Sequence, residues 1–197
     1  PTRRSSDLWT HMGIPPPDQL NVPICTRAIA SESDSVQQPL VLLNPTIDGI
    51  VTDFFEWRGA GNINTQPPLG AMWKADGLFT AIQFGWTSHQ LVMRFDPDET
   101  STTRQGLDVD IRLQGPQFTF RLTFALTSPG PEAFLLSRQT QADAWQEIGS
   151  YRSIKAHTIL EVAVPWKELC LEQGHTIQMS IIVREHGLEV ARYPGHH

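Results

Sequence analysis

The chain has 197 residues, enough to bury one hydrophobic core, and all-β domains of this size are commonly single units. Its composition, 40% hydrophobic and 18% charged, is globular, and a formal net charge of −6 argues against a nucleic-acid partner because phosphate binding needs a basic face. No stretch approaches the roughly 20 apolar residues of a membrane helix, and no signal-peptide pattern opens the chain. We therefore expect no membrane association and a cytoplasmic location.

Residues 1–39 differ from the rest and are interpreted as a lead-in and linker. Residues 7–13 have the length of a short helix, which Gly13 and the prolines after it would end. The stretch 31–39 is polar, as linkers are, so the compact domain is predicted over residues 40–197. Because the first residue is Pro1 rather than Met, we expect a piece of a larger protein, and the closing His196-His197 fits either native residues or a tag remnant.

From residue 40 onward the dominant hydrophobic period is two. In 117–128, phenylalanine and leucine alternate with threonine and arginine, which is the pattern of a half-buried strand. The segments 107–114 and 177–184 alternate in the same way, and Gly115 lies in a predicted hairpin turn. Further strands are expected at 78–84, 91–95, 134–136, 159–164 and 188–191, with one helical turn at 166–171. Short strands separated by Gly, Pro and Asp turns predict an all-β fold, an antiparallel β-sandwich.

Two cysteines, Cys25 and Cys170, lie in separate segments of the chain. A secreted disulfide scaffold usually has more cysteines in a smaller domain. We therefore favour free thiols in a reducing compartment over a disulfide between these two residues.

Several short motifs carry a family resemblance. They are PTIDG at 45–49 with FEWRGAG at 55–61, and GAMW at 70–73 before the strand that starts at residue 78. Together they resemble the C-terminal β-sandwich that follows the catalytic domain in some glycoside hydrolases of family 57, and the lead-in resembles the linker between the two parts. The IDG opening and the run LEVAVPW at 160–166 are also similar to type 9 carbohydrate-binding modules and DOMON-like domains.

This resemblance implies a non-catalytic accessory domain. The catalytic residues of the family lie in an N-terminal domain of the same polypeptide, so none is carried over to this chain, and that domain is one expected partner. The other expected partner is an oligosaccharide or polysaccharide, an α-glucan if this chain follows the family.

A sugar site needs a flat apolar surface for the pyranose ring and a few polar groups for its hydroxyls. Tryptophans at strand ends and in loops suit the first need, and the polar residues beside one of them suit the second. The predicted carbohydrate-binding residues are Glu56, Trp57, Arg58, Trp73, Trp86 and Trp145. The alternative for each tryptophan is packing, which we favour for Trp166, and the alternative for Glu56 is a carboxylate held by Arg58 or by backbone amides.

Two acidic clusters allow other chemistry. The acidic turn formed by Asp96, Asp98 and Glu99 is a weak candidate for a structural calcium, but a solvated hairpin end is favoured because there is no EF-hand spacing. Asp108 and Asp110 lie about 7 Å apart on one strand face, a spacing found in glycosidases. The solvent-exposed face of an amphipathic strand is the favoured interpretation. No other cofactor is predicted.

Three functions therefore stay open. A sugar-binding domain predicts two exposed tryptophans that face a common groove. A structural domain that packs on the catalytic domain predicts buried tryptophans and an exposed apolar patch. A DOMON-type cofactor domain, the weaker alternative, would hold haem between Met93 and a histidine.

Overall fold

The computed structural model describes most of the chain beyond residue 35. The described ranges are 36–53, 55–65, 77–98, 106–127, 130–140, 144–172 and 175–194. The chain divides into two compact units, Pro1–Ser31 and Glu32–His197, and every described residue belongs to the second unit. The predicted helical turn at 7–13, Cys25, Trp73 and Glu99 lie outside the described residues.

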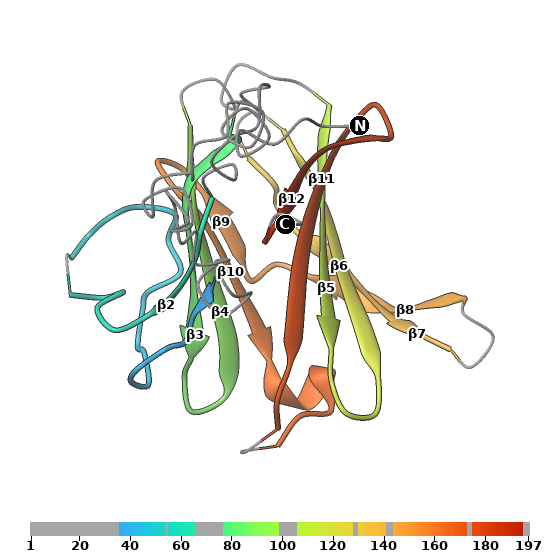
Figure 1. Cartoon of the computed structure of the whole chain (residues 1–197), viewed down its shortest axis with the longest axis horizontal. Coiled ribbons are helices and arrows are strands. Elements are labelled where there is room, and N and C mark those ends of the chain that lie inside the picture. Colours follow the sequence, from blue (N-terminus) through green and yellow to red (C-terminus); the bar gives the residue numbers. More distant parts are fainter. Residues whose placement is uncertain are drawn as a thin grey trace, which may run out of the picture. The chain divides into compact units, whose positions relative to one another are not determined.

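The first sheet has six strands in the order β1-β2-β3-β4-β10-β9, all antiparallel (Figure 1). Strand β10 pairs with β4 although β5, β6, β7 and β8 of the second sheet lie between them in the sequence. The strands are β1 (Val36–Gln37), β2 (Gly61–Ile63), β3 (Phe79–Trp86), β4 (Gln90–Pro97), β9 (Ile154–Ala156) and β10 (Leu160–Pro165).

The second sheet also has six antiparallel strands, in the order β12-β11-β5-β6-β7-β8. Its central pair, β5 and β6, is a hairpin whose turn is closed by a hydrogen bond from the Gly115 N–H to the Phe118 carbonyl at 2.9 Å, as the sequence predicted. The strands are β5 (Leu107–Gln114), β6 (Thr119–Leu126), β7 (Phe134–Gln139), β8 (Trp145–Tyr151), β11 (Gln178–Glu185) and β12 (Leu188–Tyr193).

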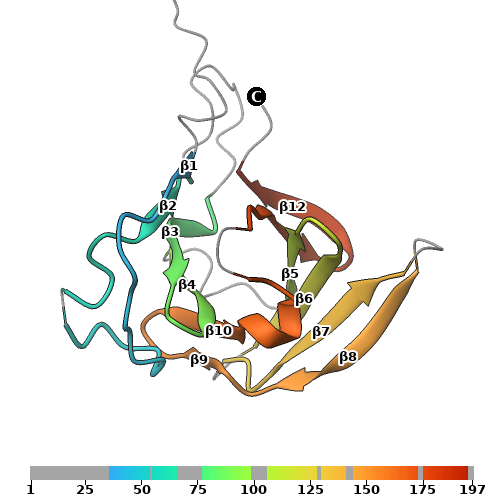
Figure 2. The same cartoon turned by 90° about the horizontal axis from the view of Figure 1, so that it is seen from below.

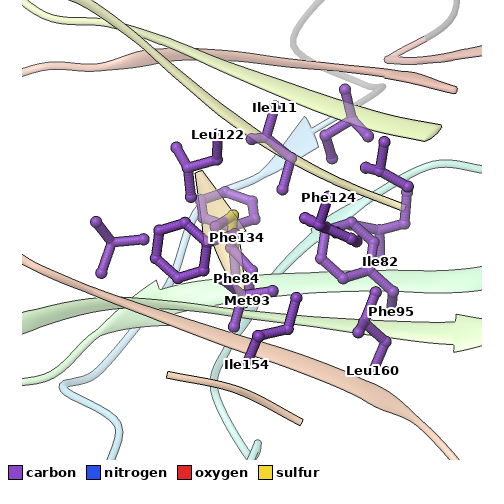
Figure 3. Packing of buried hydrophobic residues seen from close by; sticks show 14 of the residues in the cluster. Ile82, Phe84, Met93, Phe95, Ile111, Leu122, Phe124, Phe134, Ile154 and Leu160 are labelled. Carbon is purple, nitrogen blue, oxygen red and sulfur yellow. The ribbon is translucent and has the colours of Figure 1, made fainter. Parts of the chain in front are cut away.

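The two sheets enclose one hydrophobic core, so the predicted all-β antiparallel sandwich is confirmed. Figure 3 shows side chains of both sheets meeting between them, with Phe95 and Leu160 from the first sheet and Ile111 and Leu122 from the second. These side chains are almost fully buried because alternate residues of a strand point to the same face.

Several short strands were missed by the sequence pattern. Strand β8 has no continuous apolar face, and it is an edge strand whose register is set by β7 and by a bulge between Leu136 and Ser137. Residues 36–37, which were assigned to the linker, form the edge strand β1. The helical turn expected after Pro165 is present as one 3₁₀ turn, Trp166–Leu169, which ends at Cys170 with a positive φ of 50°.

A long irregular segment covers the outer face of the first sheet. We call residues 38–53 and 55–60 the covering segment; it is drawn in blue to teal beside β3, β4 and β10 in Figures 1 and 2. The Leu43 N–H donates to the carbonyl of Trp86 at 2.7 Å. Leu43 and Trp57 pack on Val92 and Ala163 in a second, smaller core. This contact explains why Val92 in β4 and Ala163 in β10 are buried on the outer face of the sheet.

Candidate functional site

A buried carboxylate, that of Glu161 in β10, anchors the covering segment to the first sheet. Glu161 is 0% exposed. Its Oε2 accepts hydrogen bonds from the backbone N–H groups of Asp48 at 3.0 Å and Gly49 at 2.9 Å, and its Oε1 accepts one from Trp57 Nε1 at 3.1 Å. A carboxylate can be buried when its oxygens are hydrogen bonded. The IDG motif, Trp57 and Glu161 therefore form one structural unit.

The backbone at this anchor is specific to glycine. Gly49 has a φ of +80°, and a Cβ added there would lie 2.9 Å from the backbone nitrogen of His157. Burial raises the pKa of the Glu161 carboxyl above its ordinary value of 4.5, because desolvation outweighs the bonds from Gly49, Asp48 and Trp57. Among the described residues, the Glu161 carboxylate accepts hydrogen bonds only from groups of the protein itself. We therefore assign Glu161 a structural role.

Trp57 does not lie where a sugar platform was predicted. The residue is 5% exposed, and its ring packs in the small core beneath the covering segment. The indole N–H is used by Glu161. Because a platform needs an open ring face, a direct stacking role does not fit Trp57 in this fold.

The two polar neighbours of Trp57 lie at the surface of the covering segment. The Glu56 carboxylate accepts a hydrogen bond from the hydroxyl of Thr52 at 3.0 Å, rather than from Arg58 or from backbone amides as the alternative supposed. Arg58 is exposed, and its guanidinium carbon lies 5.7 Å from the centroid of the Phe55 ring. Both residues lie on the covering segment, which packs on the first sheet, whereas Trp145 lies in β8 of the second sheet. These predicted residues therefore do not form one site.

Trp86 and Trp166 lie together at one end of the sandwich. Their ring centroids are 5.2 Å apart with planes inclined by 34°, and the Trp166 indole N–H donates to the Thr87 carbonyl at 3.3 Å. Both rings are half-buried and pack against the main core. The packing predicted for Trp166 is confirmed, and Trp86 closes this end of the core instead of facing an open groove.

Asp96, the first residue of the predicted acidic turn, lies in β4 and is held by an ion pair. Arg94 donates to both carboxylate oxygens of Asp96, at 2.6 Å and 3.0 Å, in a bidentate ion pair. Within the described ranges no group of three or more His, Cys, Asp or Glu side chains is placed to hold a metal. Met93 is 0% exposed inside the main core, which leaves its sulfur without access to a haem.

The outer face of the second sheet is where Trp145 meets charged side chains. The Arg121 guanidinium carbon, from β6, lies 5.6 Å from the centroid of the half-buried Trp145 ring at the start of β8. Figure 2 shows β7 and β8 extending away from the core on this outer side. An aromatic ring beside a fixed guanidinium offers an apolar surface and hydrogen-bond donors together.

Asp110 organises the arginines of this face. Its residue exposure is 1%, whereas the sequence placed it on a solvated face with the exposed Asp108. Asp110 is buried because arginine side chains from three strands cover it. Arg184 Nη1 lies 3.0 Å and Arg121 Nε 3.1 Å from Asp110 Oδ2, and Arg112 Nε lies 3.6 Å from Oδ1.

Polar side chains continue across the sheet on either side of this cluster. Directly opposed residues on neighbouring strands point to the same face. One such row crosses β11, β5, β6, β7 and β8, and we call it the outer row: Ser180, Arg112, Arg121, Ser137 and Glu147. Four inter-strand spacings give it a length of about 19 Å.

The outer row was not predicted from the sequence, although part of its signal is present there. The predicted turn at Gly115 fixes the register of the hairpin, and counting outward from it places Arg112 opposite Arg121. The partners on β7 and β11 come from distant parts of the chain and gave no local signal. Glu161 was detectable as a single carboxylate inside an otherwise apolar strand.

Comparison with known proteins gave no assignment: no family model, curated protein or solved structure matches the chain. Across the part of the chain that the structure describes, no helix has the length and apolar character needed to cross a membrane. Cys170 is exposed and forms no disulfide bond.

Proposed function

We propose that this chain is a non-catalytic accessory domain of a glycoside hydrolase-like protein, and that it binds carbohydrate on the outer face of its second sheet. The observation that carries the proposal is the Trp145 ring held beside Arg121, whose guanidinium is fixed by the buried Asp110. A fixed arginine loses little conformational freedom on binding, which favours affinity.

The composition of the outer row supports a sugar ligand. A saccharide presents an apolar ring face and many hydroxyl groups, so its site combines an aromatic side chain with donors and acceptors. Trp145 supplies the aromatic surface, Arg112 and Arg121 supply donors, and Glu147 supplies an acceptor in the same row. The predicted site in tryptophan-lined loops is thereby moved to a strand face, with Trp145 as the retained residue.

The same face argues for binding rather than hydrolysis. Two glycosidase carboxylates have to reach the scissile bond. Asp110 is covered by three guanidinium groups and has no open path to a glycosidic oxygen, which leaves Asp108 without a partner on this strand.

Titration calorimetry with a panel of oligosaccharides tests this proposal. The panel contains maltohexaose for the predicted α-glucan, cello- and xylo-oligosaccharides, and a uronic-acid oligosaccharide. At least one member should bind, and Trp145→Ala should weaken that binding by about 10-fold or more, as removal of a central aromatic contact does. Phe55→Ala is the matched control, because it removes an exposed ring from the covering segment on the opposite sheet. Absence of binding across the panel at millimolar sugar, or a Trp145→Ala variant that binds normally, would contradict the proposal.

A second candidate, a structural domain that packs on a catalytic domain, is favoured by a separate observation. The covering segment exposes large apolar side chains, with Leu40 84%, Leu42 70% and Phe55 61% exposed, while Trp57 beneath it is buried. Clustered exposed apolar residues are typical of docking surfaces. Under this candidate, hydroxyl-radical footprinting should label Leu42 and Phe55 strongly in the isolated chain and weakly in a longer polypeptide that carries the catalytic domain. Equal labelling in both would exclude it.

A further inference from the structure

We infer that the saccharide bound on this face is acidic, and that its carboxylate or sulfate group lies against Arg112 and Arg121. This inference rests on the proposed carbohydrate site and names the class of its ligand. It starts from an excess of positive charge at the centre of the sheet. Three guanidinium groups share the single carboxylate of Asp110, so two positive charges in this cluster lack a partner inside it.

The arrangement of two of these arginines is unfavourable without an anion. Arg112 and Arg121 are directly opposed residues of the β5–β6 hairpin. Like charges in directly opposed positions destabilise a sheet. An unfavourable pair in the middle of an otherwise regular hairpin is typical of a functional position, because a bound anion would remove the repulsion.

The other carboxylates of this face do not neutralise the pair. Glu189 is engaged by Arg192 through two contacts of 2.7 Å. Asp108 and Glu147 are exposed, and neither forms an ion pair with an arginine among the described residues. Asp110 is therefore the one carboxylate within ion-pair distance of Arg112 or Arg121 in the described part of the chain.

Hydrogen bonding within the cluster is also incomplete. Asp110 Oδ1 and the Nε atoms of Arg112 and Arg121 are buried and have no hydrogen-bond partner among the described residues. The ends of both arginines reach solvent, since their side chains are 42% and 31% exposed. Asp110 thus holds the inner side of each guanidinium by charge, while the terminal nitrogens face outward for a planar anion.

The anion position lies beside the aromatic surface at one end and extends away from it at the other. The Arg121 guanidinium carbon is 5.6 Å from the centroid of the Trp145 ring, whereas the strand of Arg112 lies three inter-strand spacings, about 14 Å, from the strand of Trp145. A sugar chain lying across the strands would place an acidic group on the arginines while another residue contacts Trp145. Ser137, directly opposite Arg121, lies between them in the row and is 8% exposed.

The decisive experiment compares matched acidic and neutral sugars on the intact chain by titration calorimetry. The probes are trigalacturonate, its carboxyl-reduced neutral form, maltotriose, a sulfated chondroitin tetrasaccharide and inorganic sulfate. We expect an acidic probe to bind at least 10-fold more tightly than either neutral trisaccharide, and its affinity to fall with added salt because partly exposed charges are screened. Preference between trigalacturonate and the sulfated probe identifies the anionic group.

Two variants assign the effect to the arginines. Arg112→Gln and Arg121→Gln should each weaken the acidic sugar by about 10-fold or more, since each removes a charge-assisted contact. Each should weaken the neutral form by much less, because glutamine keeps a hydrogen-bond donor but not the charge. Arg152→Gln, an exposed arginine in the link between β8 and β9, is the charge-matched control and should bind like the parent chain. Arg112 is the more exposed of the two and serves alone if Arg121→Gln does not fold.

The outcomes separate this inference from the proposed function. Equal binding of acidic and neutral sugars, or neutral binding alone, would overturn the acidic ligand and leave the carbohydrate site in place. Inorganic sulfate that binds as tightly as the acidic sugars would reduce the cluster to a simple anion site and overturn the inference. If no sugar of either class binds, both proposals fail.

Discussion

Replacing Glu161 with Gln tests whether one carboxylate holds the covering segment on the first sheet. The carboxylate accepts hydrogen bonds from Asp48 and Gly49 at one oxygen and from Trp57 at the other. Glutamine keeps a single acceptor oxygen, so its NH₂ group has to face either the two backbone N–H groups or the indole N–H. At least one buried donor then loses its acceptor, which lowers the free energy of unfolding by about 1–3 kcal/mol.

Chemical and thermal unfolding followed by circular dichroism measure this loss. For a chain of 197 residues, the expected change lowers the unfolding midpoint by about 2–12 °C, at about 2–4 °C per kcal/mol. Amide and indole NMR spectra should show faster exchange of the Trp57 indole proton. Glu132→Gln, at an exposed position, is the control and should change stability by less than about 0.5 kcal/mol. A Glu161→Gln variant with parental stability and an unchanged Trp57 signal would refute the anchoring role.

The pH dependence of the same variant gives a second check. Burial raises the pKa of Glu161 in the folded chain above its ordinary value of 4.5, so the folded state holds this proton more tightly than the unfolded state. Its contribution to stability is then fully present below pH 4.5 and is lost as the pH rises through the folded pKa. The stability of the parent chain relative to Glu161→Gln should therefore decrease across this window. A relative stability that increases with pH would contradict the burial argument.

Two further predictions concern backbone fit and a half-buried phenol. Gly49→Ala should lower the free energy of unfolding by about 1–3 kcal/mol in denaturant melts, because φ is +80° and the new Cβ would meet the His157 backbone; an unchanged midpoint would show that the loop can move. Desolvation, with the hydrogen bond to Glu168, raises the pKa of Tyr151 to about 12. Its stabilising contribution should be present below pH 10 and lost as the pH rises through about 12. Followed by phenolate absorbance, the parent chain should show a step near pH 12 that is absent in Tyr151→Phe. A step near pH 10 that Tyr151→Phe removes would argue against the raised pKa of Tyr151.

The sequence determined the fold class and most of the strands. Alternation of apolar and polar residues is strong wherever one face of a strand is buried, so β5, β6 and β11 were placed within about two residues of their observed ends. Glycine and proline turns then separated the strands. The edge strands β1 and β8 were missed, because an edge strand with two polar faces has no periodic pattern and takes its register from a neighbour.

The candidate site was only partly predictable for a related reason. Sequence identified Trp145 as a surface aromatic and Arg121 as part of a wet strand face, but burial of Trp57 and the pairing of Trp86 with Trp166 depend on contacts between distant segments. No sequence pattern states which face a covering loop will occupy. The three predicted site tryptophans that the structure describes, Trp57, Trp86 and Trp145, are therefore separated over two sheets and one end of the sandwich.

What the sequence determined by itself is local: the period of each strand, the hairpin turn, and hence the opposition of Arg112 and Arg121. What only the tertiary structure decided is which charges meet across strands that are far apart in the chain. Arg184 approaches Asp110 from 74 residues away, and Glu161 meets the IDG loop across more than 110 residues. Pairing of β11 with β5, and of β10 with β4, brings these groups together, because sheet register converts distant positions into direct neighbours.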